Sequence, residues 1–177
     1  AQINDDSNDA SIAIGHKAGY RKVGTGSQYS KVDILIGYAS GAQLTTGNYN
    51  TAIGHSTMGG DITGTALTGA NNVVVGYGAG YQMEGQSDGN TLVGSQAGAD
   101  LTTGDTNTAV GYGAGADLTT GGNNTVVGAG AGDLIQNGVR NVAVGSDAGN
   151  VLVAGENNVI IGHGADPSGS AGSNQIV

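Results

Sequence analysis

The chain has 177 residues, of which 36 are glycine and none is cysteine, tryptophan or phenylalanine, and its formal net charge is −9. No apolar run approaches the roughly 18 residues of a membrane-spanning helix, so we expect no membrane insertion. The absence of cysteine excludes disulfides, thiolate zinc sites and cysteine nucleophiles. Because basic residues other than Arg140 all precede residue 32, the acidic remainder should repel phosphates, and we expect no nucleic-acid partner.

A five-residue unit recurs after an N-terminal lead-in, residues 1–10. The unit is Asn-(Thr/Val)-x-(Ile/Val)-Gly, and its glycines are spaced by 22, 17, 22, 18, 17, 17, 17 and 17 residues, so the period is 17. One β-branched segment per short period indicates a coil of a parallel β-solenoid. We predict an all-β fold in which residues 11–177 form a single β-solenoid domain (β-roll) of about ten 17-residue rungs, truncated in its tenth rung. The expected strands are 11–14, 33–36, 50–53, 72–75, 90–93, 107–110, 124–127, 141–144, 158–161 and 174–177.

Two insertions, at 20–31 and 59–71, interrupt the period. Insertions in a solenoid project as loops and often form the binding face. The first insertion combines basic and tyrosine side chains, which suit an acidic or sugar ligand, although it also fits a spacer that shields the first rungs. The receptor-binding candidates are Tyr20, Arg21, Lys22, Tyr29 and Lys31.

Side chains of a strand alternate between two faces, so the second and fourth positions of the unit share one face, and the first and third share the other. The fourth position is always Ile or Val, and we predict that it forms the coil core: Ile14, Ile36, Ile53, Val75, Val93, Val110, Val127, Val144 and Ile161. The third position would then form an outward apolar stripe, roughly 45 Å long for rungs about 4.8 Å apart. Its residues are candidates for a trimer axis: Ala13, Leu35, Ala52, Val74, Leu92, Ala109, Val126, Ala143 and Ile160. The alternative is that one monomer covers both faces.

Further recurring positions have structural interpretations. The first-position Asn should form an amide ladder from rung to rung. A second apolar position falls seven residues after the unit glycine, at Leu44, Leu101, Leu118, Ile135 and Leu152. All three histidines, His16, His55 and His163, directly follow a unit glycine, in a slot that also holds Tyr, Ser and Ala. We interpret this slot as a half-exposed corner, not a metal site, although three copies in a trimer leave an ion site open.

The sequence shows no motif for catalysis, and we expect neither an enzyme nor a cofactor. The glycine-rich run 76–80 imitates a dinucleotide fingerprint, but no helix pattern follows it. Glu84 and Glu156 are the only glutamates, and neither has the neighbouring acid of a glycosidase. Asp100, Asp117 and Asp133 recur near one position, where weak calcium binding competes with the simpler interpretation of a solvated acidic edge.

The units 90–98 and 107–115, Asn-Thr-Leu-Val-Gly-Ser-Gln-Ala-Gly and Asn-Thr-Ala-Val-Gly-Tyr-Gly-Ala-Gly, resemble the head repeats of trimeric autotransporter adhesins of the Yersinia adhesin type. They resemble even more closely the repeats of marine bacteriophage tail-fibre proteins. The resemblance covers residues 11–177 and implies a left-handed, trimeric β-roll with the rung strands at the threefold axis. The adhesin repeat is shorter, near 14 residues.

We therefore expect a non-enzymatic homotrimeric fibre segment, a shaft or head that mediates attachment to a host cell or surface through a glycan or protein receptor. Its place would be extracellular, on a virion tail fibre or a bacterial surface. The rival interpretation is a solitary solenoid that binds ice or another repetitive surface. A third, a polysaccharide depolymerase, needs a carboxylate pair that one chain does not show.

Overall fold

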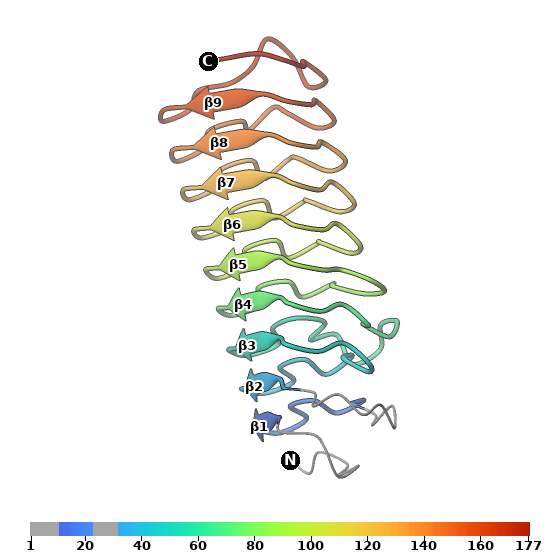
Figure 1. Cartoon of the computed structure of the whole chain (residues 1–177). Helices are drawn as coiled ribbons and strands as arrows, with labels where there is room; N and C mark the ends of the chain where they lie inside the picture. The colour runs from blue at the N-terminus through green and yellow to red at the C-terminus, as the bar shows by residue number, and fades with distance from the viewer. Residues whose placement is uncertain (1–10, 23–31) are drawn as a thin grey trace.

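The computed structural model describes residues 11–22 and 32–177, and within these ranges the chain forms short parallel strands and no helix (Figure 1). Each strand pairs with the strand of the next coil, so one sheet has the order of the sequence from β1 to β9. The predicted fold class, an all-β parallel β-solenoid with coils of about 17 residues, is confirmed. The strands are β1 (Ile12–Ile14), β2 (Ile34–Ile36), β3 (Thr51–Ile53), β4 (Val73–Val75), β5 (Thr91–Val93), β6 (Thr108–Val110), β7 (Thr125–Val127), β8 (Val142–Val144) and β9 (Val159–Ile161).

The strand register repeats without a slip from coil to coil. Thr108, for example, lies opposite Thr91 on one side and Thr125 on the other, and each pairing joins equivalent positions. The same side-chain position therefore forms a straight column along the whole sheet. After β9, Ile176 forms a parallel bridge to Val159, and the backbone N–H of Gln175 donates to Asn158 Oδ1 at 2.9 Å. The tenth rung is therefore shifted by one residue from the prediction, because Gln175 and not Asn174 lies one 17-residue period after Asn158 and takes its position.

The unit glycine ends every strand with a conformation that side chains rarely adopt. Its φ angle lies between +128° and +139° in all nine coils. At Gly111, a Cβ atom would also lie 2.4 Å from the carbonyl oxygen of Gly128 in the next coil. Glycine is therefore required here both for the backbone angle and for the close approach of two coils.

The hydrophobic core fills the coil between the third strand position and the second apolar column. The third-position side chains of β2 to β9 are at most 1% exposed, and Ala13 of β1 is half-buried against the same core. The predicted second apolar position is buried in full at Leu44, Leu101, Leu118, Ile135 and Leu152, and Leu67 and Met83 extend its column.

The two faces of the strand are therefore the reverse of our prediction. The proposed axis residues lie inside the coil: Ala13, Leu35, Ala52, Val74, Leu92, Ala109, Val126, Ala143 and Ile160. The proposed core residues point outward and are exposed or half-buried: Ile14, Ile36, Ile53, Val75, Val93, Val110, Val127, Val144 and Ile161. The physical reason is the asparagine at the first position, which shares a face with the third position and finds its hydrogen-bond partners inside the coil, in the adjacent rungs.

The asparagines form the predicted ladder from Asn50 to Asn158. Each Asn Nδ2 donates to the preceding Asn Oδ1 at 2.9–3.2 Å, and the same oxygen accepts the backbone N–H of the following asparagine at 2.8–3.1 Å. Nδ2 also donates to a backbone carbonyl of the next coil, as Asn107 does to Gly121 at 2.9 Å. All of these amides are at most 1% exposed. The ladder thus satisfies polar groups that the narrow core would otherwise leave unpaired.

An ion pair begins the ladder. In the second coil the asparagine position holds Asp33, whose Oδ1 accepts the backbone N–H of Asn50 at 2.8 Å. Lys22 donates to the other oxygen, Oδ2, and to the carbonyl of Gly47, and both charged side chains are at most 1% exposed. The carboxylate supplies the acceptor that the ladder needs, and Lys22 neutralises its charge.

Candidate functional site

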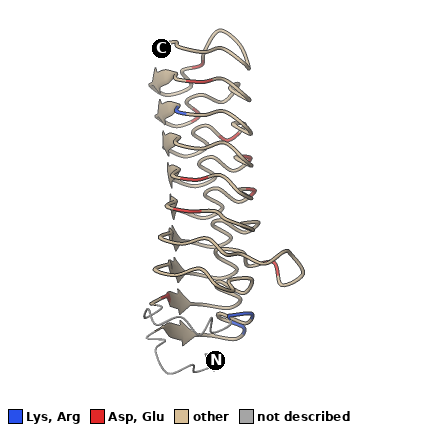
Figure 2. Ribbon diagram, turned by 45° about the vertical axis from the view of Figure 1, so that its right-hand side comes forward, with Lys and Arg blue, Asp and Glu red and all other residues tan. Residues whose placement is uncertain are grey.

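The outward strand face is a continuous β-branched surface with two columns. One column is the second strand position and the other is the fourth, and the most exposed members lie at the ends, with Ile14 at 59% and Ile161 at 62%. No strand contains a charged residue, and the arrows in Figure 2 are free of charge colours. Nine rungs about 4.8 Å apart make this face roughly 38 Å long. Contiguous apolar surface of this extent marks an interaction site in most soluble proteins.

The second-position column was not predicted to be exposed, because the sequence pattern was interpreted with that face in the interior. The signal was present in the first position, since a buried amide ladder forces the second and fourth positions outward. The column mixes aliphatic and hydroxyl side chains: Ile12, Ile34, Thr51, Val73, Thr91, Thr108, Thr125, Val142 and Val159.

A ladder of stacked rings follows the strand face at the corner after the unit glycine. His16, Tyr38, His55 and Tyr77 stack in successive coils, with ring centroids 5.3, 4.8 and 5.4 Å apart. All four rings are exposed. The slot is thus an aromatic column on the solvent side of the corner, and histidine alternates with tyrosine along it. Across the described residues, no three His, Asp or Glu side chains gather in an arrangement that would hold a metal ion.

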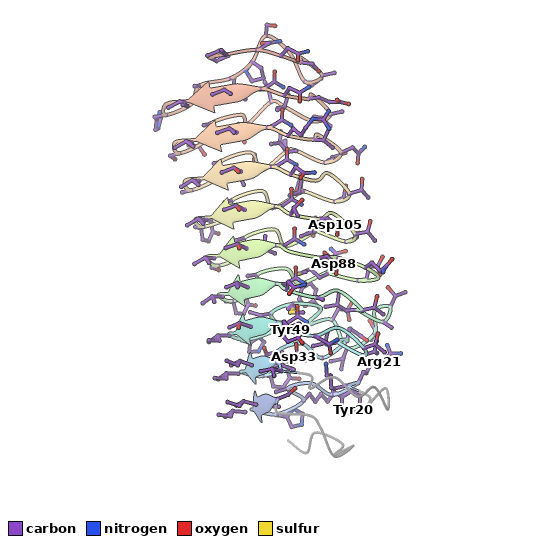
Figure 3. The ribbon with its side chains drawn as sticks, in the orientation of Figure 1. Tyr20, Arg21, Asp33, Tyr49, Asp88 and Asp105 are labelled. Carbon is purple, nitrogen blue, oxygen red and sulfur yellow. The ribbon has the colours of Figure 1, made fainter. Side chains whose placement is uncertain are left out.

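The receptor-binding candidates of the first insertion separate into three groups. Tyr20, at 66% exposed, and Arg21 lie on the surface at the end of the solenoid that carries β1 and β2 (Figure 3). Lys22 is wrong as a candidate, because its ammonium group is buried against Asp33. Tyr29 and Lys31 lie outside the described residues.

The second insertion contains a loop, residues 60–66, that projects from the coil beside β3 (Figure 1). Arg21 Nη1 donates to Gln43 Oε1 at 2.5 Å and to the carbonyl of Gly64 at 3.1 Å. The first insertion therefore contacts the second. Within the loop, the backbone N–H and hydroxyl of Thr63 donate to Asp61 and hold the pKa of that carboxyl below its usual value.

Asp117 and Asp133 lie in adjacent coils, where the backbone N–H of Asp117 donates to the carbonyl of Asp133 at 2.8 Å. Burial raises the pKa of the Asp133 carboxyl, and the negative charges of Asp117 and Asp147 raise it further. Asp100 accepts a hydrogen bond from Gln82 Nε2 at 2.7 Å. These contacts are those of a partly solvated acidic edge in which neighbouring carboxylates repel one another.

Comparisons of the chain with family models, with curated proteins and with solved structures find no match. The part of the chain that the structure describes contains no helix long and apolar enough to cross a membrane.

Proposed function

We propose that the chain is a non-enzymatic, adhesive fibre segment in which three copies of the solenoid pack side by side. It would mediate attachment to a host cell or surface from a phage tail fibre or a bacterial cell surface. The observation that supports this proposal is the outward strand face, which consists of aliphatic and threonine side chains, carries no charge and is continuous from β1 to β9. A second copy of the same chain has the matching length and period, so a closed rotational assembly covers every rung at once.

The corrected orientation of the strands supports the assembly better than the predicted one. The third position varies in size between Ala and Leu or Ile, whereas every fourth-position residue is Ile or Val. A uniform β-branched column makes a flat surface that packs evenly against a copy of itself. The choice of three copies follows the resemblance to adhesin head repeats, in which the rung strands face a threefold axis.

The solution mass of the 177-residue chain tests the assembly. Light scattering should give three times 17.1 kDa for the natural sequence. Val110→Asp places a charge in the middle of the outward face and should shift the mass toward one chain, while circular dichroism keeps its β signal. Asn137→Asp, on an exposed turn away from the strands, is the control and should leave the mass unchanged. A monomeric natural chain at every concentration would refute the trimer.

A second candidate function rests on the regularity of the same face. On β5, β6 and β7 the two outward columns are Thr and Val in three consecutive coils, a flat lattice of hydroxyl and methyl groups. Such a lattice, with a repeat of about 4.8 Å along the solenoid, could bind ice or another repetitive surface. Thermal hysteresis from a monomeric chain would favour this function, and its absence at millimolar concentration would remove it.

A further inference from the structure

A surface hollow of about 360 Å³ lies on the side of the coil that follows the strand corner, between the coils of β3 and β5. Its floor is Gly78, where an added Cβ atom would meet only the Gln96 side chain, at 3.9 Å. Tyr77 and Tyr81 of the same turn form its walls, and Ser56, Gln96 and Asp100 contribute from the coils on either side. Its volume is at the lower end of the range, roughly 300–1,000 Å³, that small-molecule sites occupy.

The hollow lies where a glycine corner is flanked by coils with polar side chains at the same position and by two tyrosines of its own coil. Ser56, Gly78 and Gln96 occupy the same corner position in successive coils, each with a φ angle between +52° and +62°. Only the middle one lacks a side chain, so a gap one residue deep opens between two polar side chains. The next coil also holds the small residues Ser95 and Ala99 where the β4 coil has its two tyrosines.

The walls present aromatic surface to the solvent. Tyr77 ends the ring ladder, since it stacks on His55 at 5.4 Å while the following coil places a serine in the slot. Tyr77 is 61% exposed and Tyr81 is 37% exposed, although the transfer of a tyrosine ring out of water is favourable. Two uncovered rings beside one hollow favour a ligand with an apolar face.

The polar groups around the rings are mostly neutral and can both donate and accept hydrogen bonds. The Gln96 amide, the Ser56 hydroxyl and the two phenol groups all have this double capacity. The one carboxylate, Asp100, accepts a hydrogen bond from Gln82 at 2.7 Å, which fixes its orientation. Sugar hydroxyls also donate and accept, and a pyranose ring carries an apolar C–H face between them.

We infer that the hollow between Tyr77 and Tyr81 is a binding site for a neutral hexose unit of a glycan. The tyrosine rings contact the apolar face of the sugar ring, and Gln96, Asp100 and Ser56 bond its hydroxyls. Anionic sugars are disfavoured by Asp100 and by the acidic chain. The site would supply the receptor class for the attachment proposed above and depends on that proposal only for its role, since one chain provides every group.

The site continues beyond Tyr81 into a smaller hollow of about 60 Å³ beneath the loop 60–66. Asp61, Thr65 and Glu84 line it, and Thr65 donates a hydrogen bond to Glu84. A hollow of this volume is too small for a second sugar ring, so the proposed site holds a single hexose unit.

Saturation-transfer NMR with the methyl glycosides of glucose, galactose, mannose and N-acetylglucosamine tests the site on the full chain. At least one should bind at millimolar concentration, and Tyr77→Ala or Tyr81→Ala should weaken it at least about tenfold. Gly78→Gln fills the hollow with the residue that the next coil carries at the same φ, and it should abolish binding. Gly113→Gln, at the equivalent corner with φ +62° and nothing within 4 Å, is the matched control and should bind as the natural chain does.

Three results would overturn the site: no hexose binds, Gly78→Gln binds as well as the control, or choline chloride binds in a salt-sensitive way while the hexoses do not. The last result would identify a site for cations between aromatic rings. Light scattering on the same samples separates this test from that of the fibre. A monomer that binds hexose would refute the trimer but support the hexose site. A trimer that binds no hexose would refute the site but support the trimer.

Discussion

The asparagine ladder gives the sharpest prediction for stability. Asn107→Ala, at the centre of the solenoid, would remove the side-chain partner of two buried backbone groups. These are the N–H of Asn124, which donates to Asn107 Oδ1 at 3.0 Å, and the carbonyl of Gly121, which accepts from Asn107 Nδ2 at 2.9 Å. Each buried unpaired group costs about 1–3 kcal/mol, so the loss in the free energy of unfolding should be about 2–6 kcal/mol. A domain has only about 5–15 kcal/mol in total.

Guanidinium denaturation followed by circular dichroism, at one fixed protein concentration, measures this loss. Asn137→Ala is the control, because the Asn137 side chain is exposed and accepts only from the hydroxyls of Thr119 and Thr120. The control should change the free energy of unfolding by no more than about 0.5 kcal/mol. If Asn107→Ala were as stable as the control, the ladder would contribute nothing and the reason given for the inward third position would fail with it.

Three further predictions concern the corner, the ion pair and the acidic edge. Gly111→Ala should prevent folding, because its Cβ would lie 2.4 Å from a backbone oxygen, whereas Gly113→Ala, with nothing within 4 Å, should cost only about 1–2 kcal/mol for its left-handed backbone; circular dichroism and soluble yield compare the two. Asp33→Asn should lower the free energy of unfolding by about 3–5 kcal/mol, because it leaves the buried Lys22 charge unpaired, and the double change with Lys22→Met should recover most of it in chemical denaturation. Asp133→Asn should raise the melting temperature at pH 7. The raised pKa of Asp133 means that folding favours its protonated form, so ionisation of this carboxyl destabilises the native chain as pH rises through the folded pKa. The stability gained by Asp133→Asn should therefore vanish as pH falls below 3.8, where the natural carboxyl becomes protonated in both the folded and the unfolded chain.

The solenoid, its period and its amide ladder could be predicted because each depends on residues at a fixed offset. The side of the strand that faces the core could not be read from the strand alone. Alternation only separates positions two and four from position three, and in this chain both sets are largely apolar. The buried Asn at position one decides between them, because it shares a face with position three and needs its partners in the adjacent coils.

The hollow above Gly78 was also missed, for a different reason. The corner slot was noted to hold tyrosine, but Tyr77 was not singled out, and the equivalent of Tyr81 in most coils is a smaller or acidic residue. The site depends on side chains from three coils, and the insertion 59–71 hides their offset. Aligning the coils at their glycines places Ser56, Gly78 and Gln96 in one column, which is the signal that could have found it.

Two adjacent residues of β7 separate the core from the proposed interface. Val126 is 1% exposed and points into the coil, and Val127 is half-buried and points outward. Val126→Asp should unfold the chain, because it buries a carboxylate among apolar side chains, a change that costs several kcal/mol. Val127→Asp should keep the circular dichroism of the solenoid and reduce the solution mass from three chains to one. The reverse pattern, an unfolded Val127→Asp and a folded monomer for Val126→Asp, would restore the inward fourth position and place the assembly interface on the third. If both variants stayed folded trimers, neither column would form the interface, and the uncharged strand face would have to bind something other than a copy of the chain.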